Sequence, residues 1–352
     1  MRSGNANHGG EQAKATVVAD DVPLGIGVPT GIGSLPHDEP SAAVEFVLEH
    51  LPELPAAPSL PARDPRESML AQAAWGITGV DVAADGSLAV DPARLDPAAP
   101  LHDDGLTGAP FVTLQTFLSA VAGRTGAIKV QTTGPVTLAC SLVAEGADPT
   151  VAAAVAGAAV RARAVALVDA VAAVAPDAPV VAFLDEPGLV GGPPPELGHP
   201  DAVVDLVSSA MAAWETRAIT GIHCCGPTDW ATLLQAGPRI LSAPVGADLH
   251  LGAGALAAFL ERDGWIAWGA VPTDRPLGDS ASHWWRELSA QWCELVQAGC
   301  DPVRIRRQAL VTPACGLARH HLPQAELVVE LTHAVGLRIH DQLAGVRLSV
   351  GA

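Results

Sequence analysis

The stretch IKVQTTGPVTL, residues 128–138, contains a strand pattern followed directly by the start of a helix pattern. Residues 128–133 form a short apolar and β-branched run, which predicts a β-strand. Gly134 and Pro135 follow, and proline is favoured at the first position of a helix because no partner is needed there for its missing N–H. We therefore expect a strand, a tight turn and a helix over about 137–145, which is the repeating unit of a parallel α/β sheet.

The same alternation runs through most of the chain. It predicts strands at residues 28–34, 57–60 (the weakest pattern), 128–133, 180–185, 220–225, 240–244, 266–271 and 309–313. Helical patterns lie between them, at about 39–52, 66–79, 137–145, 150–175, 201–217, 228–236, 252–262, 280–299 and 323–345. Eight parallel strands joined by helices close into a barrel. The expected fold is a single (β/α)8 TIM barrel over residues 26–352.

Two segments depart from this alternation. Residues 81–106 carry Asp85-Gly86 between apolar runs, which predicts a β-hairpin inserted after the early helices. Residues 1–25 lack a long apolar run and the pattern of a secretory signal, so we expect a disordered N-terminal tail.

The composition excludes several classes of partner. The 352 residues include 20 lysines and arginines against 38 aspartates and glutamates, a formal net charge of −18. Nucleic acid is therefore not expected as a partner, because phosphate backbones are bound through clustered basic residues. The alanine-rich residues 151–174 are long enough to suggest a membrane span, but Arg161, Arg163 and Asp169 interrupt them. We expect a soluble cytoplasmic protein without a membrane partner.

The cysteines and one histidine form the most informative pattern. Residues 221–226 read GIHCCG, and residues 312–317 read TPACGL. Side chains two apart on a strand project to the same side, so His223 and Cys225 point together while Cys224 faces away. Cys315 lies at the end of the last predicted strand, just after residue 313, and can approach the same place. An imidazole with two thiolates suits Zn2+, although buried cysteines without a metal are also common.

These residues carry a resemblance to a known family. The strings GIGSLP (31–36), VQTTGPVTL (130–138), LDEP (184–187), HCC (223–225) and TPACGL (312–317) occur in the order found in the C-terminal barrel of cobalamin-independent methionine synthase. The chain resembles a free-standing member of this superfamily, which also includes uroporphyrinogen decarboxylase and zinc-dependent corrinoid and coenzyme M methyltransferases. The resemblance extends over residues 28 to about 345.

The resemblance implies a function and a set of site residues. His223, Cys225 and Cys315 match the zinc ligands, and zinc activates a thiol for attack on a methyl group. Ser34 matches the serine that holds the amino acid, and Asp185 matches the catalytic-site carboxylate that binds the homocysteine ammonium group. Glu186, beside it, is expected in the same substrate-binding site, although paired acids before a proline also suit a solvated loop. The implied activity is methyl transfer to a small-molecule thiol, homocysteine, in methionine biosynthesis.

The chain also departs from the family pattern. Ala243 is expected where the synthase has a glutamate ligand, so the fourth zinc ligand is water, substrate, Asp248 or His250. The folate-stacking tryptophan is replaced near Cys140 and Ser141. The expected donor is therefore not polyglutamyl folate, and a corrinoid, a corrinoid protein or another small methyl compound is the alternative.

Two further readings remain open from the sequence. One is a different member of the superfamily, either a corrinoid- or coenzyme M-type alkyltransferase or a porphyrin decarboxylase, for which Arg63 and Arg66 are the nearest basic pair. The other is a non-catalytic barrel that binds a thiol amino acid or zinc.

Overall fold

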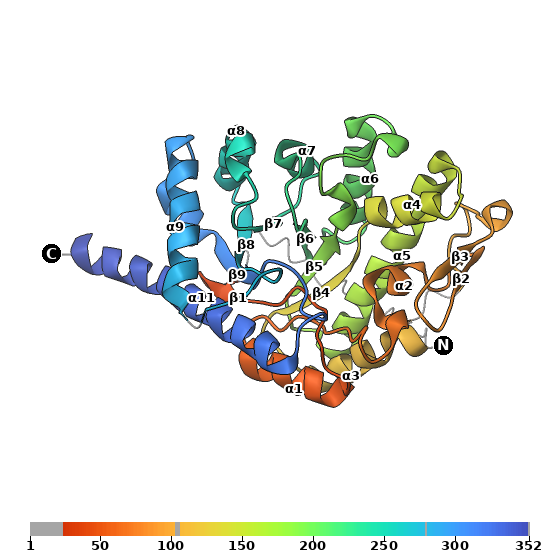
Figure 1. The fold of residues 1–352 in the computed structure, drawn as a ribbon, viewed down its shortest axis with the longest axis horizontal. Helices are drawn as coiled ribbons and strands as arrows, with labels where there is room; N and C mark the ends of the chain where they lie inside the picture. Colours follow the sequence, from red (N-terminus) through yellow and green to blue (C-terminus); the bar gives the residue numbers. More distant parts are fainter. Residues whose placement is uncertain (1–23, 103–105, 279, 351–352) are drawn as a thin grey trace, which may run out of the picture.

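A computed structural model describes residues 24–102, 106–278 and 280–350 of the chain. All but the last two residues of the predicted tail at 1–25 therefore lie outside the described residues. The fold is α/β, with one curled sheet of seven parallel strands in the order β1-β9-β8-β7-β6-β5-β4 (Figure 1). These strands are β1 (Val28–Pro29), β4 (Ile128–Thr133), β5 (Val180–Asp185), β6 (Ile219–His223), β7 (Ile240–Pro244), β8 (Trp265–Val271) and β9 (Ala309–Pro313).

Helices cover the outer side of the curled sheet (Figure 1). The described residues contain eleven α-helices: α1 (Pro40–His50), α2 (Met69–Ala74), α3 (Val112–Ala120), α4 (Pro135–Ala144), α5 (Pro149–Val174), α6 (Pro200–Ala212), α7 (Trp230–Gln235), α8 (Ala253–Glu261), α9 (Ala281–Gln297), α10 (Pro302–Arg307) and α11 (Leu322–Val350). The parallel order confirms the predicted class of fold, because each strand is followed by a helix that returns the chain to the start of the next strand.

The predicted closure into an eight-stranded barrel is wrong. β1 and β4 are the two edges of the sheet, and the segment predicted as the second strand makes only isolated parallel bridges, Ser34 with Ser59 and Ala56 with Lys129. Prolines at 55, 58 and 61 explain the difference, because each removes a backbone N–H that a ladder needs. The fold is therefore an incomplete barrel whose gap is spanned by irregular chain.

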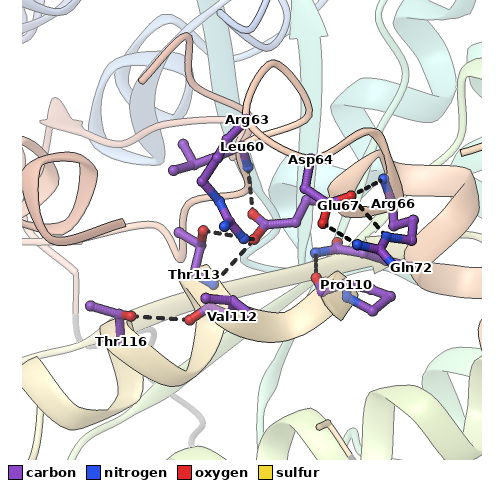
Figure 2. Close-up of polar contacts among 10 residues, drawn as sticks. All are labelled: Leu60, Arg63, Asp64, Arg66, Glu67, Gln72, Pro110, Val112, Thr113 and Thr116. Carbon is purple, nitrogen blue, oxygen red and sulfur yellow. Dashed lines mark hydrogen bonds and ion pairs between the residues drawn. The ribbon is translucent and has the colours of Figure 1, made fainter. Parts of the chain in front are cut away.

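The buried carboxylate of Glu67 holds the end of this irregular segment in place. Glu67 is fully buried and accepts hydrogen bonds from the backbone N–H of Leu60 at 2.8 Å, the Arg63 guanidinium at 2.6 Å and the Thr113 hydroxyl at 2.9 Å (Figure 2). Thr113 lies in the first turn of α3. The carboxylate thus ties the loop to α3 in place of the cross-strand bonds that a second strand would supply.

The predicted hairpin is confirmed. β2 (Val80–Val82) and β3 (Leu88–Val90) pair antiparallel and form a separate two-stranded sheet. The turn contains Gly86 at φ +78°, a conformation that glycine adopts without a steric penalty, and Asp85 accepts a hydrogen bond from the backbone N–H of Ser87.

The curled sheet has one hydrophobic cluster on its inner face and another on its outer face. The inner cluster is small and comes largely from the first halves of the strands: Val28, Leu54, Ala127, Val181, Phe183, Ile219, Ile240, Ala267 and Leu310. The outer cluster packs the sheet against the helices and includes Ile222, Cys224, Leu241 and Ala243. Apolar side chains fill the inside at the strand beginnings, with the buried Lys129 as an exception, whereas Asp185 and His223 are the last residues of their strands.

α5 has the length and apolar character of a membrane span. In the structure 56% of its apolar window is buried inside the protein, and its buried face includes the charged side chain of Arg163. Such burial is typical of a core helix in a soluble α/β domain.

Candidate active site

The structure brings His223, Cys225 and Cys315 together at the carboxyl ends of the strands. His223 is the last residue of β6, Cys225 lies two residues beyond it, and Cys315 lies two residues beyond β9. Their ligand atoms all lie within 4.8 Å of one another. Sulfur atoms bound to one tetrahedral zinc lie about 3.8 Å apart, given Zn–S bonds of about 2.3 Å. The three side chains therefore have nearly the spacing of a zinc site.

His223 is held by one of its ring nitrogens. Its Nδ1 lies 2.9 Å from the Ser242 hydroxyl oxygen, and His223 and Ser242 are directly paired in the register of β6 and β7. The other nitrogen, Nε2, is shielded from solvent and has no hydrogen-bond partner. A buried nitrogen without a partner is costly unless something binds it. Nε2 is thus the chemically available ligand atom of this side chain.

The two thiols are partly buried and form no disulfide. The Cys225 thiol and His223 lower the pKa of the Cys315 thiol, because both favour its charged thiolate form. A thiolate is the form of cysteine that binds a metal. Cys224 is buried with its sulfur 3.6 Å from the Gly226 carbonyl oxygen, and it packs in the outer cluster, away from the other two thiols.

The donor set fits zinc. One unpartnered imidazole nitrogen and two sulfurs, drawn from two strand ends, match the ligand preferences of this ion and leave a coordination position for substrate. The described residues place no carboxylate in the same cluster. His223, Cys225 and Cys315 would therefore hold the ion as three protein ligands.

The expected position of a fourth ligand on β7 needs correction. Ala243 packs with Leu241 in the outer cluster against the helices, whereas Ile240 belongs to the inner cluster. Side chains alternate along a strand, so the inward residue at this level is Ser242 and not Ala243. Asp248 and His250, the other candidates, are exposed near the 3-10 turn η6 (Leu249–Gly252) and lie outside the cluster.

Asp185 lies beside the imidazole. It is the last residue of β5 and is paired in register with His223. Its Oδ1 is shielded from solvent and has no hydrogen-bond partner. Burial raises the pKa of Asp185, and the nearby positive charge of Lys129 opposes this effect. An unpartnered carboxylate oxygen at a strand end is suited to bind a cationic group of a substrate.

Glu186, which was predicted to bind substrate, is fully buried and makes hydrogen bonds within the protein. Its carboxylate accepts hydrogen bonds from the backbone N–H groups of Val136 at 2.9 Å and Thr137 at 2.8 Å, and from the Thr137 hydroxyl at 2.6 Å. These donors form the N-terminus of α4, where a negative charge is favourable. Burial raises the pKa of Glu186 to about 7. Gly134 allows this approach, because an added Cβ would lie 2.2 Å from the carboxylate carbon.

Ser34 lies beside the second cysteine. Its backbone carbonyl oxygen accepts a hydrogen bond from the N–H of Leu317 at 2.8 Å, and its hydroxyl oxygen lies 2.1 Å from where a Cβ on Gly316 would be. The loops after β1 and β9 therefore interlock next to Cys315. The serine predicted to hold the amino acid is placed near the predicted metal ligands.

Sequence reasoning missed Lys129 as a site residue. Its side chain is buried inside the curled sheet, where Nζ donates to the Ile32 carbonyl at 2.9 Å and to the Gln131 side-chain oxygen at 3.1 Å. Burial lowers its pKa to about 8, and Asp185 opposes the shift. The available signal was that one of only two lysines in the chain occurs in a predicted buried strand.

Comparisons with known proteins support the fold. No protein-family model and no curated protein sequence matches the chain. A solved structure described as a methyltransferase from Methanosarcina mazei is 16% identical, with a TM-score of 0.58 over 92% of this chain and 98% of its own. Another, described as the "Putative Vitamin-B12 Independent Methionine Synthase from Listeria monocytogenes", is 16% identical, with a TM-score of 0.56 over 87% of this chain and 86% of its own. The chain shares their fold over nearly its whole described length.

Proposed function

We propose that this protein is a zinc-dependent methyltransferase that moves a methyl group to the sulfur of homocysteine, giving methionine. The observation that carries the proposal is the buried, unpartnered Nε2 of His223 beside the thiols of Cys225 and Cys315. The shared fold with proteins described as a methyltransferase and a methionine synthase supports it.

Each residue has a task in this proposal. His223, Cys225 and Cys315 hold the ion, and Asp185 binds the substrate ammonium group through its unpartnered oxygen. Zinc, when bound, supplies a Lewis acid that lowers the pKa of a substrate thiol and makes it nucleophilic at neutral pH. Ser34 borders the acceptor site through its contact with the Gly316 loop.

The carboxylate of Asp185 favours an amino acid as the acceptor. Homocysteine carries an ammonium group that pairs with a carboxylate, whereas coenzyme M carries a sulfonate that a carboxylate repels. Lys129 is the nearby cation, but its buried ammonium group already donates hydrogen bonds to the Ile32 carbonyl and the Gln131 side chain. We therefore place coenzyme M second among acceptors.

Porphyrin decarboxylation is not supported by Arg63 and Arg66, the nearest basic pair for binding such a substrate. Arg63 pairs with Glu67 at 2.6 Å, and Arg66 pairs with Asp64 at 2.8 Å through two hydrogen bonds (Figure 2). A substrate with many carboxylates needs cations that are not already neutralised. Both guanidinium groups are engaged with acidic side chains of the same loop.

The donor in this proposal is a corrinoid, a corrinoid protein or another small methyl compound in place of polyglutamyl folate. Cys140 and Ser141 are partly buried on α4, where the family resemblance implies a tryptophan that stacks on folate. Neither side chain offers an aromatic face to a pteridine ring.

Metal analysis and turnover test the proposal together. Zinc is measured by elemental analysis in the wild type, Cys225→Ser and Cys315→Ser, with Cys293→Ser as the matched control because Cys293 is exposed on α9. We expect one zinc per chain in the wild type and control and a loss in both ligand variants. Undiminished zinc in both ligand variants would reject the site.

Methionine formation is then measured with homocysteine and each donor class, and coenzyme M replaces homocysteine in a parallel series. Formation of methylated coenzyme M without formation of methionine would show that coenzyme M, and not homocysteine, is the acceptor. Tight homocysteine binding without turnover on any donor would favour the non-catalytic reading.

A further inference from the structure

We infer that Ser242 is a positioning residue for the metal site, whose hydroxyl oxygen accepts the Nδ1 proton of His223 and so presents Nε2 to the ion. The inference rests on the proposed zinc site and adds a residue to it. Ser242 is not itself a ligand in this inference. It acts only through the imidazole.

The first support is the geometry of the two side chains. Ser242 is 1% exposed, and its hydroxyl oxygen lies 2.9 Å from His223 Nδ1. The two residues are register partners on neighbouring parallel strands, so their side chains leave the sheet on the same, inner side. The contact is therefore built into the sheet and does not depend on a loop.

The second support is the backbone around the same residue. The Ser242 carbonyl oxygen accepts a hydrogen bond from the N–H of Cys224 at 3.1 Å. Cys224 lies between His223 and Cys225, so one residue of β7 contacts the first predicted ligand and the residue that joins it to the second.

The direction of the hydrogen bond follows from what surrounds the imidazole. A neutral imidazole has one N–H donor and one nitrogen that accepts. If the serine donated to Nδ1, Nε2 would carry the proton, yet this buried nitrogen makes no hydrogen bond in the structure. If Nδ1–H donates to the serine, Nε2 presents a lone pair toward the two thiols, as a metal ligand must.

The third support is the place of Ser242 in the sheet. It is the inward residue of β7 at the level of His223, where the neighbouring Ala243 faces the helices. A neutral hydroxyl is a poor zinc ligand beside thiolates, but it is a good partner for a ligating histidine. Ser242 therefore supports a predicted ligand through the imidazole.

Two measurements test the inference. Nitrogen NMR of the protein labelled with 15N-histidine reports which ring nitrogen of His223 carries the proton, with its signals assigned by their loss in His223→Asn. We expect the Nδ1–H form in the metal-free protein and Nε2 coordination after zinc is added. The Nε2–H form in the metal-free protein, or coordination through Nδ1, would overturn the inference.

Zinc affinity is measured in competition with a chelator for Ser242→Ala, Ser242→Thr and the matched control Ser209→Ala, whose serine is exposed on α6. We expect Ser242→Ala to weaken zinc binding about 10–100-fold, Ser242→Thr to recover most of it, and the control to match the wild type. Thermal unfolding of the metal-free variants separates this effect from a loss of fold.

Equal zinc affinity in Ser242→Ala and the wild type would overturn the inference and leave the proposed function intact. A wild type that binds no zinc would instead remove the proposed function, and the imidazole spectrum would still decide whether the serine accepts the Nδ1 proton.

Discussion

Ser34 and Gly316 are packed so closely that a Cβ on Gly316 would lie 2.1 Å from the Ser34 hydroxyl oxygen. Real side-chain carbons do not approach other atoms this closely, so only glycine fits without a shift of the serine. The contact joins the loop after β1 to the loop that carries Cys315. Ser34 is therefore in direct contact with the loop that carries Cys315.

This contact predicts the effect of Gly316→Ala. The added methyl group should displace Ser34 and weaken homocysteine binding about tenfold, while overpacking lowers the free energy of unfolding by about 1–3 kcal/mol. Calorimetric titration with homocysteine and chemical denaturation measure the two effects. Gly254→Ala is the matched control, since nothing lies within 4 Å of its added Cβ, and it should leave both values unchanged within error or slightly raise stability. Unaltered binding in Gly316→Ala would show that the Ser34 loop does not form part of the acceptor site.

The buried Glu67 predicts a large loss of stability on truncation. Glu67→Ala removes the acceptor of the Leu60 N–H, the Thr113 hydroxyl and the Arg63 guanidinium, and leaves these groups unpaired (Figure 2). We expect the free energy of unfolding to fall by about 2–4 kcal/mol. Urea denaturation measures it, with the exposed Glu45→Ala on α1 as control. A loss no larger than that of the control would contradict the assigned role of Glu67 in holding the irregular segment.

The raised pKa of Glu186 predicts a pH dependence of stability. Its pKa is about 7 in the folded protein against 4.5 for an ordinary glutamate, so the folded state binds more protons between these values. The stability from this group is therefore full below about pH 4.5 and is lost as the pH rises through about 7. The shift corresponds to about 3 kcal/mol.

The test compares the wild type with Glu186→Gln, because other groups also titrate in this range. The difference in their unfolding free energies should change by about 3 kcal/mol between pH 4.5 and pH 8, with the wild type losing stability relative to the variant as the pH rises. A difference that is constant across this range would show that Glu186 is already ionised in the folded protein at low pH.

Local pattern was sufficient to predict most of the sheet. The runs at 180–185 and 240–244 are strands with the predicted bounds, because each is a short apolar stretch bounded by polar or proline-rich chain. The run at 57–60 also looks apolar, but the neighbouring prolines leave it with isolated bridges. Such a segment becomes a strand only if its backbone N–H groups can pair with the strands on either side of it. Those strands are distant in the sequence, so the local pattern does not reveal this pairing.

The candidate site could likewise be predicted only where local sequence determines the geometry. His223 and Cys225 lie on one side of their strand end because residues two apart share a face, and this follows from the local sequence. Ala243 was expected at the position of the family's glutamate ligand, yet Ser242 is the inward residue of β7, because a shift of one residue in alignment exchanges the two faces of a strand. The Glu186 carboxylate could not be distinguished from a substrate-binding group, since its partners at the start of α4 lie about fifty positions earlier in the chain.

The unpartnered oxygen of Asp185 predicts that its replacement weakens binding of the thiol acceptor and leaves zinc binding unchanged. Asp185→Asn keeps the size of the side chain but removes the negative charge that we assign to the substrate ammonium group. Loss of a hydrogen bond to a charged group costs about 1.5–3 kcal/mol, so the KM for homocysteine should rise about 10–100-fold. Zinc content should remain that of the wild type, because Asp185 is not in the ligand cluster.

The control for this experiment is Asp205→Asn, which removes one negative charge from an exposed position on α6. It should change neither zinc content nor KM. A thiol that lacks the ammonium group, such as 3-mercaptopropionate, should bind the wild type and Asp185→Asn with similar affinity or prefer the variant, since the carboxylate repels its negative charge. If Asp185→Asn instead lost zinc and left the KM of the remaining loaded protein unchanged, the carboxylate would belong to the metal site and the acceptor assignment would fail.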